Sequence, residues 1–134
     1  MKLSRTVAYA VRATLQLAQS ESDRPVPCSK LAAEGNMPER FLLQILRNLV
    51  THGILRSTRG VDGGYALTRR PEDISLLDVI EAIEGPLDAG ESGSDGLAGE
   101  SKEKLQDALR NITDMARQQL GAIKFSQLLE PPKA

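Results

Sequence analysis

Four side chains share one face of a helix that the sequence predicts over residues 38–52, and their chemistry suits contacts to DNA bases. At about 100° per residue, Leu43, Gln44 and Arg47 fall within about 60° of Arg40 around the helix axis. Gln and Arg can form paired hydrogen bonds with adenine and guanine in the major groove, and Leu can contact a thymine methyl. The alternative is the solvated face of an ordinary amphipathic helix.

A turn rich in Gly and Arg follows this helix, between strands predicted at residues 54–57 and 65–68. Gly60 and the neighbouring glycines leave little bulk around Arg59, so we expect this side chain to protrude. An arginine on a narrow loop suits the minor groove, where the negative potential of DNA is deepest. A simple solvated β-turn is the alternative explanation of the same residues.

Cys28 and His52 are the only residues of their types, which limits the other chemistry open to the chain. A single Cys excludes an intrachain disulfide, and one Cys with one His leaves little for triad catalysis, so we expect no enzyme. Cys28 is a candidate redox switch because the start of a helix lowers a thiol pKa; packing as a small apolar residue is the alternative. We expect His52 to bind the terminal carbonyls of its helix.

These features require a scaffold of helices with a short hairpin. Apolar spacing predicts a first helix over residues 3–20 and a short second helix over residues 29–34. Pro38 suits the first turn of the third helix. The side of that helix expected to face the core carries Phe41, Leu42, Ile45, Leu46, Leu49 and Val50. The predicted fold class is mainly α with a small β-wing, a winged helix-turn-helix.

The C-terminal part is predicted to hold two further helices. Ser75 and Asp78 have the spacing of a capping box that opens a helix ending near Glu84. Residues 85–101 contain five Gly and four acidic residues and no basic one, which predicts a flexible loop. A long helix follows, to about residue 120, with the spacing of a coiled-coil seam that suits dimerisation. The seam residues are Leu105, Leu109, Ile112, Ala116 and Ile123.

Charge is divided unevenly along the 134 residues. Residues 1–75 carry 11 Lys and Arg against 7 Asp and Glu, a net charge of +4; residues 76–134 carry 6 against 11, a net of −5. A basic N-terminal half suits a polyanionic partner, although ordinary surface variation also gives such a difference. No apolar run reaches the length of a membrane span, and Arg5 and Arg12 interrupt the N-terminal apolar stretch. We therefore expect a cytoplasmic protein without membrane association.

Several motifs resemble those of the BadM/Rrf-type winged-helix transcription regulators. The most specific is Ser57-Thr-Arg-Gly-Val-Asp-Gly-Gly-Tyr-Ala-Leu67. The others include Met1-Lys-Leu-Ser4, Tyr9-Ala10, Pro25-Val-Pro27, Phe41-Leu42 with Gln44-Ile45, Asp78-Val-Ile80 and Glu84-Gly85. The resemblance covers residues 1–86 well, whereas residues 101–130 resemble the family's dimerisation helix in placement and spacing only.

The resemblance implies a homodimer that binds a pseudo-palindromic operator in double-stranded DNA, as a repressor. Residues 1–84 would form the DNA-binding domain, with the helix-turn-helix at 28–51 and the wing at 54–68. A loop over residues 85–101 and a dimerisation segment over 102–130 would follow. The residues expected to contact DNA are Lys2, Ser4, Arg5, Pro38, Arg40, Leu43, Gln44, Arg47, Arg59 and Gly60.

The chain departs from the cluster-binding members of that family. Those members carry three Cys between the fourth helix and the dimerisation helix, where residues 85–101 hold no Cys and no His. The sequence therefore predicts no iron–sulfur cluster or other metal and resembles the cluster-less branch that includes CymR. A protein or a small molecule is the expected effector. The alternative function is a protein-interaction adaptor that uses the winged-helix surface.

Overall fold

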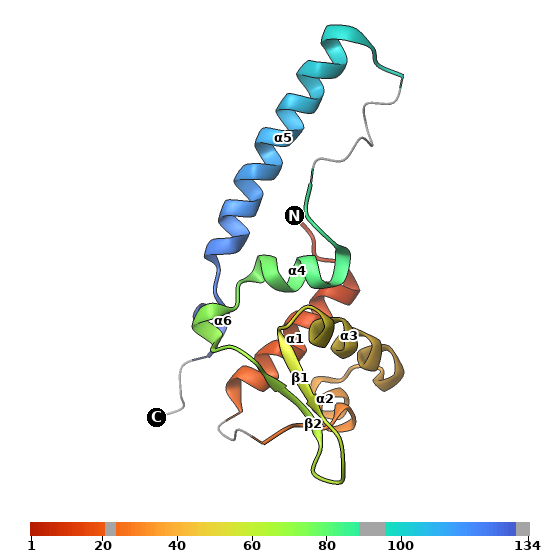
Figure 1. The fold of residues 1–134 in the computed structure, drawn as a ribbon, viewed down its shortest axis with the longest axis vertical. Helices are drawn as coiled ribbons and strands as arrows, with labels where there is room; N and C mark the ends of the chain where they lie inside the picture. Colours follow the sequence, from red (N-terminus) through yellow and green to blue (C-terminus); the bar gives the residue numbers. More distant parts are fainter. Residues whose placement is uncertain (21–23, 89–95, 131–134) are drawn as a thin grey trace.

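Helices and a two-stranded hairpin surround an apolar core, with a smaller apolar cluster beside it, in the computed structural model, which describes residues 1–20, 24–88 and 96–130 (Figure 1). The elements are α1 (Arg5–Gln19), α2 (Cys28–Gly35), α3 (Glu39–Thr51), β1 (Leu55–Thr58), β2 (Gly64–Leu67), a 3-10 turn η1 (Pro71–Asp73), α4 (Leu76–Glu84), α5 (Gly99–Ala122) and α6 (Phe125–Leu128). This order and packing form a winged helix-turn-helix, as the sequence predicts. No helix in the described ranges is both long and apolar enough to cross a membrane.

The apolar side of α3 lies at the centre of the core. Leu42, Leu46 and Leu49 are completely buried there, and α1 and α4 pack against the same helix. Burying one such leucine contributes about 1.5–3 kcal/mol relative to leaving it in water. This helix therefore has little freedom to rotate about its axis, and its polar side is fixed facing outward.

Side chains of α1 complete the end of α2. Asn36 ends α2 in the left-handed conformation with φ at +53°, which Asn tolerates better than most residues. The Arg12 guanidinium donates to the Gly35 carbonyl at 2.8 Å, and the Gln16 amide donates to the Leu31 carbonyl at 3.2 Å. The Arg12 bond satisfies the Gly35 carbonyl, which is one of the carbonyls that the last turn of a helix leaves without partners. The turn between α2 and α3 is thereby held against α1.

The hairpin is antiparallel, with Arg56 opposite Ala66 and Ser57 opposite Tyr65. Both strands lie one residue away from their predicted positions. Val26, in the segment that leads into α2, pairs with Tyr65 through hydrogen bonds of 2.8 and 2.9 Å. The hairpin is therefore fastened to the chain that enters the helix-turn-helix.

α5 extends away from the rest of the described chain and meets it at its C-terminal end (Figure 1). Leu120 is buried there against Val7 and Ile80. The helix begins at Gly99, earlier than predicted, and continues through Gly121 to Ala122. Ile123 lies beyond it in extended conformation, and its carbonyl accepts a hydrogen bond from the Leu76 amide. The predicted seam therefore does not continue to Ile123, because the chain leaves the helix to pair with the start of α4.

Candidate nucleic-acid interface

The polar face of α3 presents the predicted side chains outward. Arg40, Gln44 and Arg47 are exposed, and Leu43 is half-buried beside them. Gln44 donates a long hydrogen bond of 3.4 Å to the Asn48 side chain. Within the described part of the chain, no bond engages the guanidinium groups of Arg40 and Arg47. The helix thus offers two unneutralised cations and one amide from a rigid support, which is the donor set for base edges and phosphates.

Phe41 departs from the predicted core. Its side chain is 44% exposed, and its ring meets the Tyr9 ring edge-on with the centroids 5.9 Å apart. The Arg12 guanidinium lies over the Tyr9 ring, 5.6 Å from its centre. The prediction was wrong because Phe41 lies in the first turn of α3, where the contact with Tyr9 of α1 leaves much of its side chain in water. Val50, also expected in the core, is half-buried.

The wing tip is narrow and open. Gly60 has φ at +112°, and a Cβ added there would meet nothing within 4 Å. The Gly63 amide donates to the Gly60 carbonyl at 3.0 Å, which closes the turn. Arg59 is exposed, and Val61 at the apex is fully exposed. The turn therefore holds Arg59 on a thin projection, as an arginine that enters a minor groove requires.

The predicted N-terminal contacts lie elsewhere on the molecule. Lys2, Ser4 and Arg5 precede or open α1, and the N-terminus lies beside α4, well separated from the wing tip (Figure 1). Ser4 also has a structural role that was not predicted from the sequence: its hydroxyl accepts a hydrogen bond from the Val7 amide at 3.1 Å and caps the start of α1. Pro38 caps α3 from the preceding position rather than lying within its first turn.

The sequence offers Cys28 either as a redox switch or as a small packed residue, and its side chain is half-buried. Burial and the nearby charge of Glu39 raise the pKa of Cys28 above its ordinary value. The thiol lies 3.7 Å from the Glu39 carbonyl, to which it donates weakly. A raised pKa disfavours the thiolate that a redox switch requires, so it favours the alternative of a small packed residue. His52 does behave as predicted: its Nδ1 lies 2.9 Å from the Asn48 carbonyl near the end of α3.

The long helix carries the predicted dimerisation residues on a largely uncovered surface. Leu105, Leu109 and Ala116 are half-buried, whereas Ile112 and Met115 are 63% and 65% exposed. An aliphatic and a thioether side chain so exposed on one helix favour contact with another apolar surface.

A polar clamp, which the sequence did not reveal, fixes α5 to α4. The Glu81 carboxylate accepts bonds from the Arg117 guanidinium at 2.6 Å and from the Leu87 amide at 2.8 Å. Arg117 also donates to the Leu87 carbonyl at 3.1 Å. Partial burial acts to raise the pKa of Glu81, but these hydrogen bonds and the Arg117 charge outweigh it and hold that pKa below its ordinary value.

The family model described as Rrf2, iron-dependent transcriptional regulator, matches residues 3–131. The chain belongs to the Rrf2 family. This confirms the resemblance that the motifs carried, and the family consists of transcriptional regulators rather than enzymes. An HTH-type transcriptional regulator of Mycobacterium tuberculosis is 46% identical over 87 residues, which are 65% of this chain and 54% of that protein. The chain thus matches about half the length of that relative.

Other Rrf2-family relatives match over most of the chain. The regulator CymR of Bacillus subtilis is 28% identical over 116 residues, covering 85% of this chain and 84% of CymR. The solved structure of this CymR, which is described as the global cysteine regulator of B. subtilis, superimposes on this chain with a TM-score of 0.76. The two sequences are 27% identical, and the superposition covers 96% of this chain and 95% of CymR. The structure of IscR from T. potens gives a TM-score of 0.72 at 26% identity, covering 96% of this chain and 85% of IscR.

The family description names iron, and the Cys and His content of this chain does not fit an iron–sulfur cluster. Iron–sulfur clusters are held chiefly by Cys thiolates, and the chain contains one Cys and one His. Cys28 touches the start of α3 and His52 follows its end, so about 20 Å of helix separates them. Among the described residues, no group of three His, Cys, Asp or Glu side chains could hold a metal ion. Of the acidic residues in the predicted loop, Glu91 and Asp95 lie outside the described residues.

Proposed function

We propose that this chain is a sequence-specific DNA-binding transcription regulator that acts as a homodimer on a pseudo-palindromic operator. The observation that carries the proposal is the pairing of an outward Arg and Gln face on α3 with a thin Arg59 wing in one rigid unit. The Val26–Tyr65 bridge supports it, since it holds the wing in a fixed position relative to the helix-turn-helix.

In this proposal α3 enters the major groove, and Arg59 with Gly60 approaches the adjacent minor groove. Arg40, Leu43, Gln44 and Arg47 contact base edges or neighbouring phosphates, and Pro38 lies beside them at the start of α3. Lys2, Ser4 and Arg5 approach DNA phosphates farther from the wing. Two copies join along α5 through Leu105, Leu109, Ile112 and Ala116. Their reading helices then meet half-sites about 34–36 Å apart, one helical turn of DNA. The bound dimer represses by blocking access to the DNA.

We also propose that the signal is not an iron–sulfur cluster. The Cys and His content and the separation of Cys28 from His52 support this, because a single chain cannot supply the ligands. Regulation then depends on a protein or a small molecule. The raised pKa of the Cys28 thiol argues against a thiol oxidation switch as the substitute.

The test begins with selection of bound fragments from genomic DNA by the purified protein. A palindromic consensus is expected. Arg59→Ala should then weaken binding to this site by about 1–3 kcal/mol, or roughly 5- to 150-fold, in a gel-shift titration at fixed salt. Arg110→Ala is the matched control, because this exposed arginine lies on α5, away from the wing, and pairs with Asp107.

Two results would contradict the proposal. Selection that enriches no sequence would exclude specific readout by the α3 face. Unchanged operator affinity in Arg59→Ala, with the same salt dependence as the parent protein, would exclude the wing as a DNA contact.

A further inference from the structure

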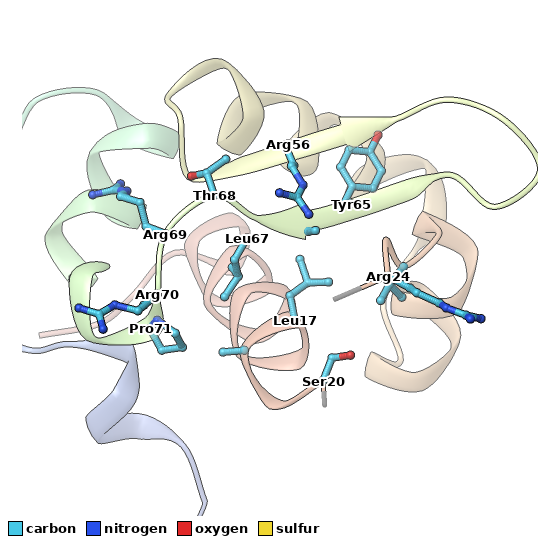
Figure 2. A pocket seen from close by; sticks show the side chains of 13 residues that line it. Leu17, Ser20, Arg24, Arg56, Tyr65, Leu67, Thr68, Arg69, Arg70 and Pro71 are labelled. Carbon is cyan, nitrogen blue, oxygen red and sulfur yellow. The ribbon is translucent and has the colours of Figure 1, made fainter. Parts of the chain in front are cut away.

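A pocket at the base of the wing lies apart from the surface proposed to contact DNA. It has a volume of about 340 Å³, at the lower end of the range for small-molecule sites. The last turn of α1 forms one wall, strand β2 forms the other, and residues 69–71 close one end (Figure 2). No α3 residue and no wing-tip residue lines it. The pocket is therefore a separate concavity and not part of the reading face.

The chemistry of the pocket walls is mixed. Leu17, Val26 and Leu67 supply aliphatic surface, and Tyr65 also lines the pocket, with its ring directed away from Leu17 and Leu67 (Figure 2). Four arginines also line it, and none of its described lining residues is acidic. Such a combination suits a ligand with an apolar body and a negatively charged end.

The four arginines are not equivalent. Arg69 lies 3.5 Å from the Asp78 carboxylate, and Arg70 lies 3.4 and 3.6 Å from Asp73 and Glu72. Their side chains extend away from Leu17 and Leu67 (Figure 2). Arg24 has an interaction of its own. Three of the cations are thus already engaged.

Arg56 is different. Its side chain extends from β1 across β2 toward Leu17 and Leu67 (Figure 2). Within the described residues its guanidinium makes no hydrogen bond and no ion pair. One unneutralised guanidinium beside an aliphatic wall matches a single negative charge, and its fork of N–H donors fits a planar carboxylate.

We propose that this pocket binds a small organic monocarboxylate, with the carboxylate on Arg56 and the apolar body against Leu17 and Leu67. The bound carboxylate contacts both α1 and β2, so its binding affects the position of the wing relative to α1. The site goes beyond DNA recognition and does not depend on it. Its test therefore uses the protein without DNA, and failure of either proposal leaves the other standing.

The experiment is an NMR titration of the ¹⁵N-labelled full-length chain with hexanoate and with 4-phenylbutyrate. We expect the amide signals of Leu17, Arg56, Tyr65 and Leu67 to shift, with a Kd of about 1 mM or tighter, as small-ligand efficiencies allow. The corresponding amides, hexanamide and 4-phenylbutyramide, are the uncharged controls and should bind at least about tenfold more weakly.

Arg56→Gln should raise the Kd for the carboxylates by about tenfold or more, and Arg59→Gln, outside the pocket, should leave it unchanged. Arg56 is exposed, and an unchanged spectrum away from the pocket verifies that Arg56→Gln folds normally. Equal binding of acids and amides, or undiminished binding by Arg56→Gln, would overturn the proposal. If the Arg56 side-chain signal shifts on addition of a random-sequence DNA duplex but not on addition of either carboxylate, Arg56 would instead be assigned to DNA phosphates.

Discussion

Replacing Gly64 by Ala should detach the wing from the segment that enters α2. A Cβ at this position would lie 2.4 Å from the Val26 carbonyl carbon, 2.5 Å from its oxygen and 2.7 Å from the Pro27 nitrogen. All three atoms belong to backbone and cannot move aside as a flexible side chain would. In addition, Gly64 has φ at +149°, a conformation that side-chain-bearing residues rarely adopt.

The expected loss of stability follows from the contacts between the wing and Val26 that must break. Relief of the contact breaks the two hydrogen bonds between Val26 and Tyr65, of 2.8 and 2.9 Å, each worth about 1 kcal/mol. The backbone conformation costs about 1–3 kcal/mol more for Ala. Together we expect Gly64→Ala to lower the free energy of unfolding by about 3–5 kcal/mol, a large part of the usual 5–15 kcal/mol.

Gly60→Ala is the matched control. Gly60 also has a positive φ, of +112°, but a Cβ there meets nothing within 4 Å. It should therefore cost only the conformational part, about 1–3 kcal/mol. Urea unfolding followed by circular dichroism, at one fixed protein concentration, measures both values. Equal losses for the two variants would refute the argument that the close approach to Val26 fastens the wing.

Three further experiments test other parts of the structure. Glu81→Gln should lower the free energy of unfolding by about 1–2 kcal/mol at pH 7, because the carboxylate pairs with Arg117. The pKa of Glu81 is lowered in the folded state, so the difference in unfolding free energy between the parent protein and Glu81→Gln should shrink as pH falls below the ordinary Glu pKa. Urea titrations at several pH values measure this difference, and a difference that does not change with pH would contradict the clamp. Ile112→Glu should shift the sedimentation coefficient toward that of a monomer, because it places a charge on the exposed apolar face of α5. Asn111→Glu is the control and should not, because Asn111 is already polar and exposed. Equal sedimentation of the two variants would exclude this face of α5 from the dimer contact. Because the pKa of Cys28 is raised, its thiol should react with iodoacetamide more slowly than a free cysteine at pH 7, and a faster reaction would restore the redox hypothesis.

Local patterns were sufficient to predict most of the fold. The two faces of α3 follow from its 3.6-residue period, and the capping box of Ser75 and Asp78 is present with both of its hydrogen bonds. Each depends on residues a few positions apart, where spacing determines geometry. The errors at Phe41 and Ile123 arose because the same period was extended to positions whose surroundings depend on other elements.

The long-range features could not be predicted in the same way. Glu81 and Arg117 are 36 residues apart, and Val26 pairs with Tyr65 across the whole helix-turn-helix. The direction of the Cys28 pKa shift depends on burial and on Glu39, neither of which the residues next to Cys28 in the sequence reveal. The Arg56 pocket likewise forms only when α1 and β2 meet. For the interface, sequence identified the outward side chains, while the fold determined which of them lie together.

Because α5 is attached near its C-terminal end, a small rotation at the attachment moves its N-terminal end by a larger distance. Its 24 residues extend about 36 Å, and Leu120 and the Arg117 clamp hold it at the end nearest α4. A rotation of about 5° at that end displaces the far end by about 3 Å, close to the rise of one DNA base pair, which is about 3.4 Å. A sub-ångström change around Glu81 is thereby enlarged to a displacement of about 3 Å at the N-terminal end of α5, beyond the residues proposed to join two copies.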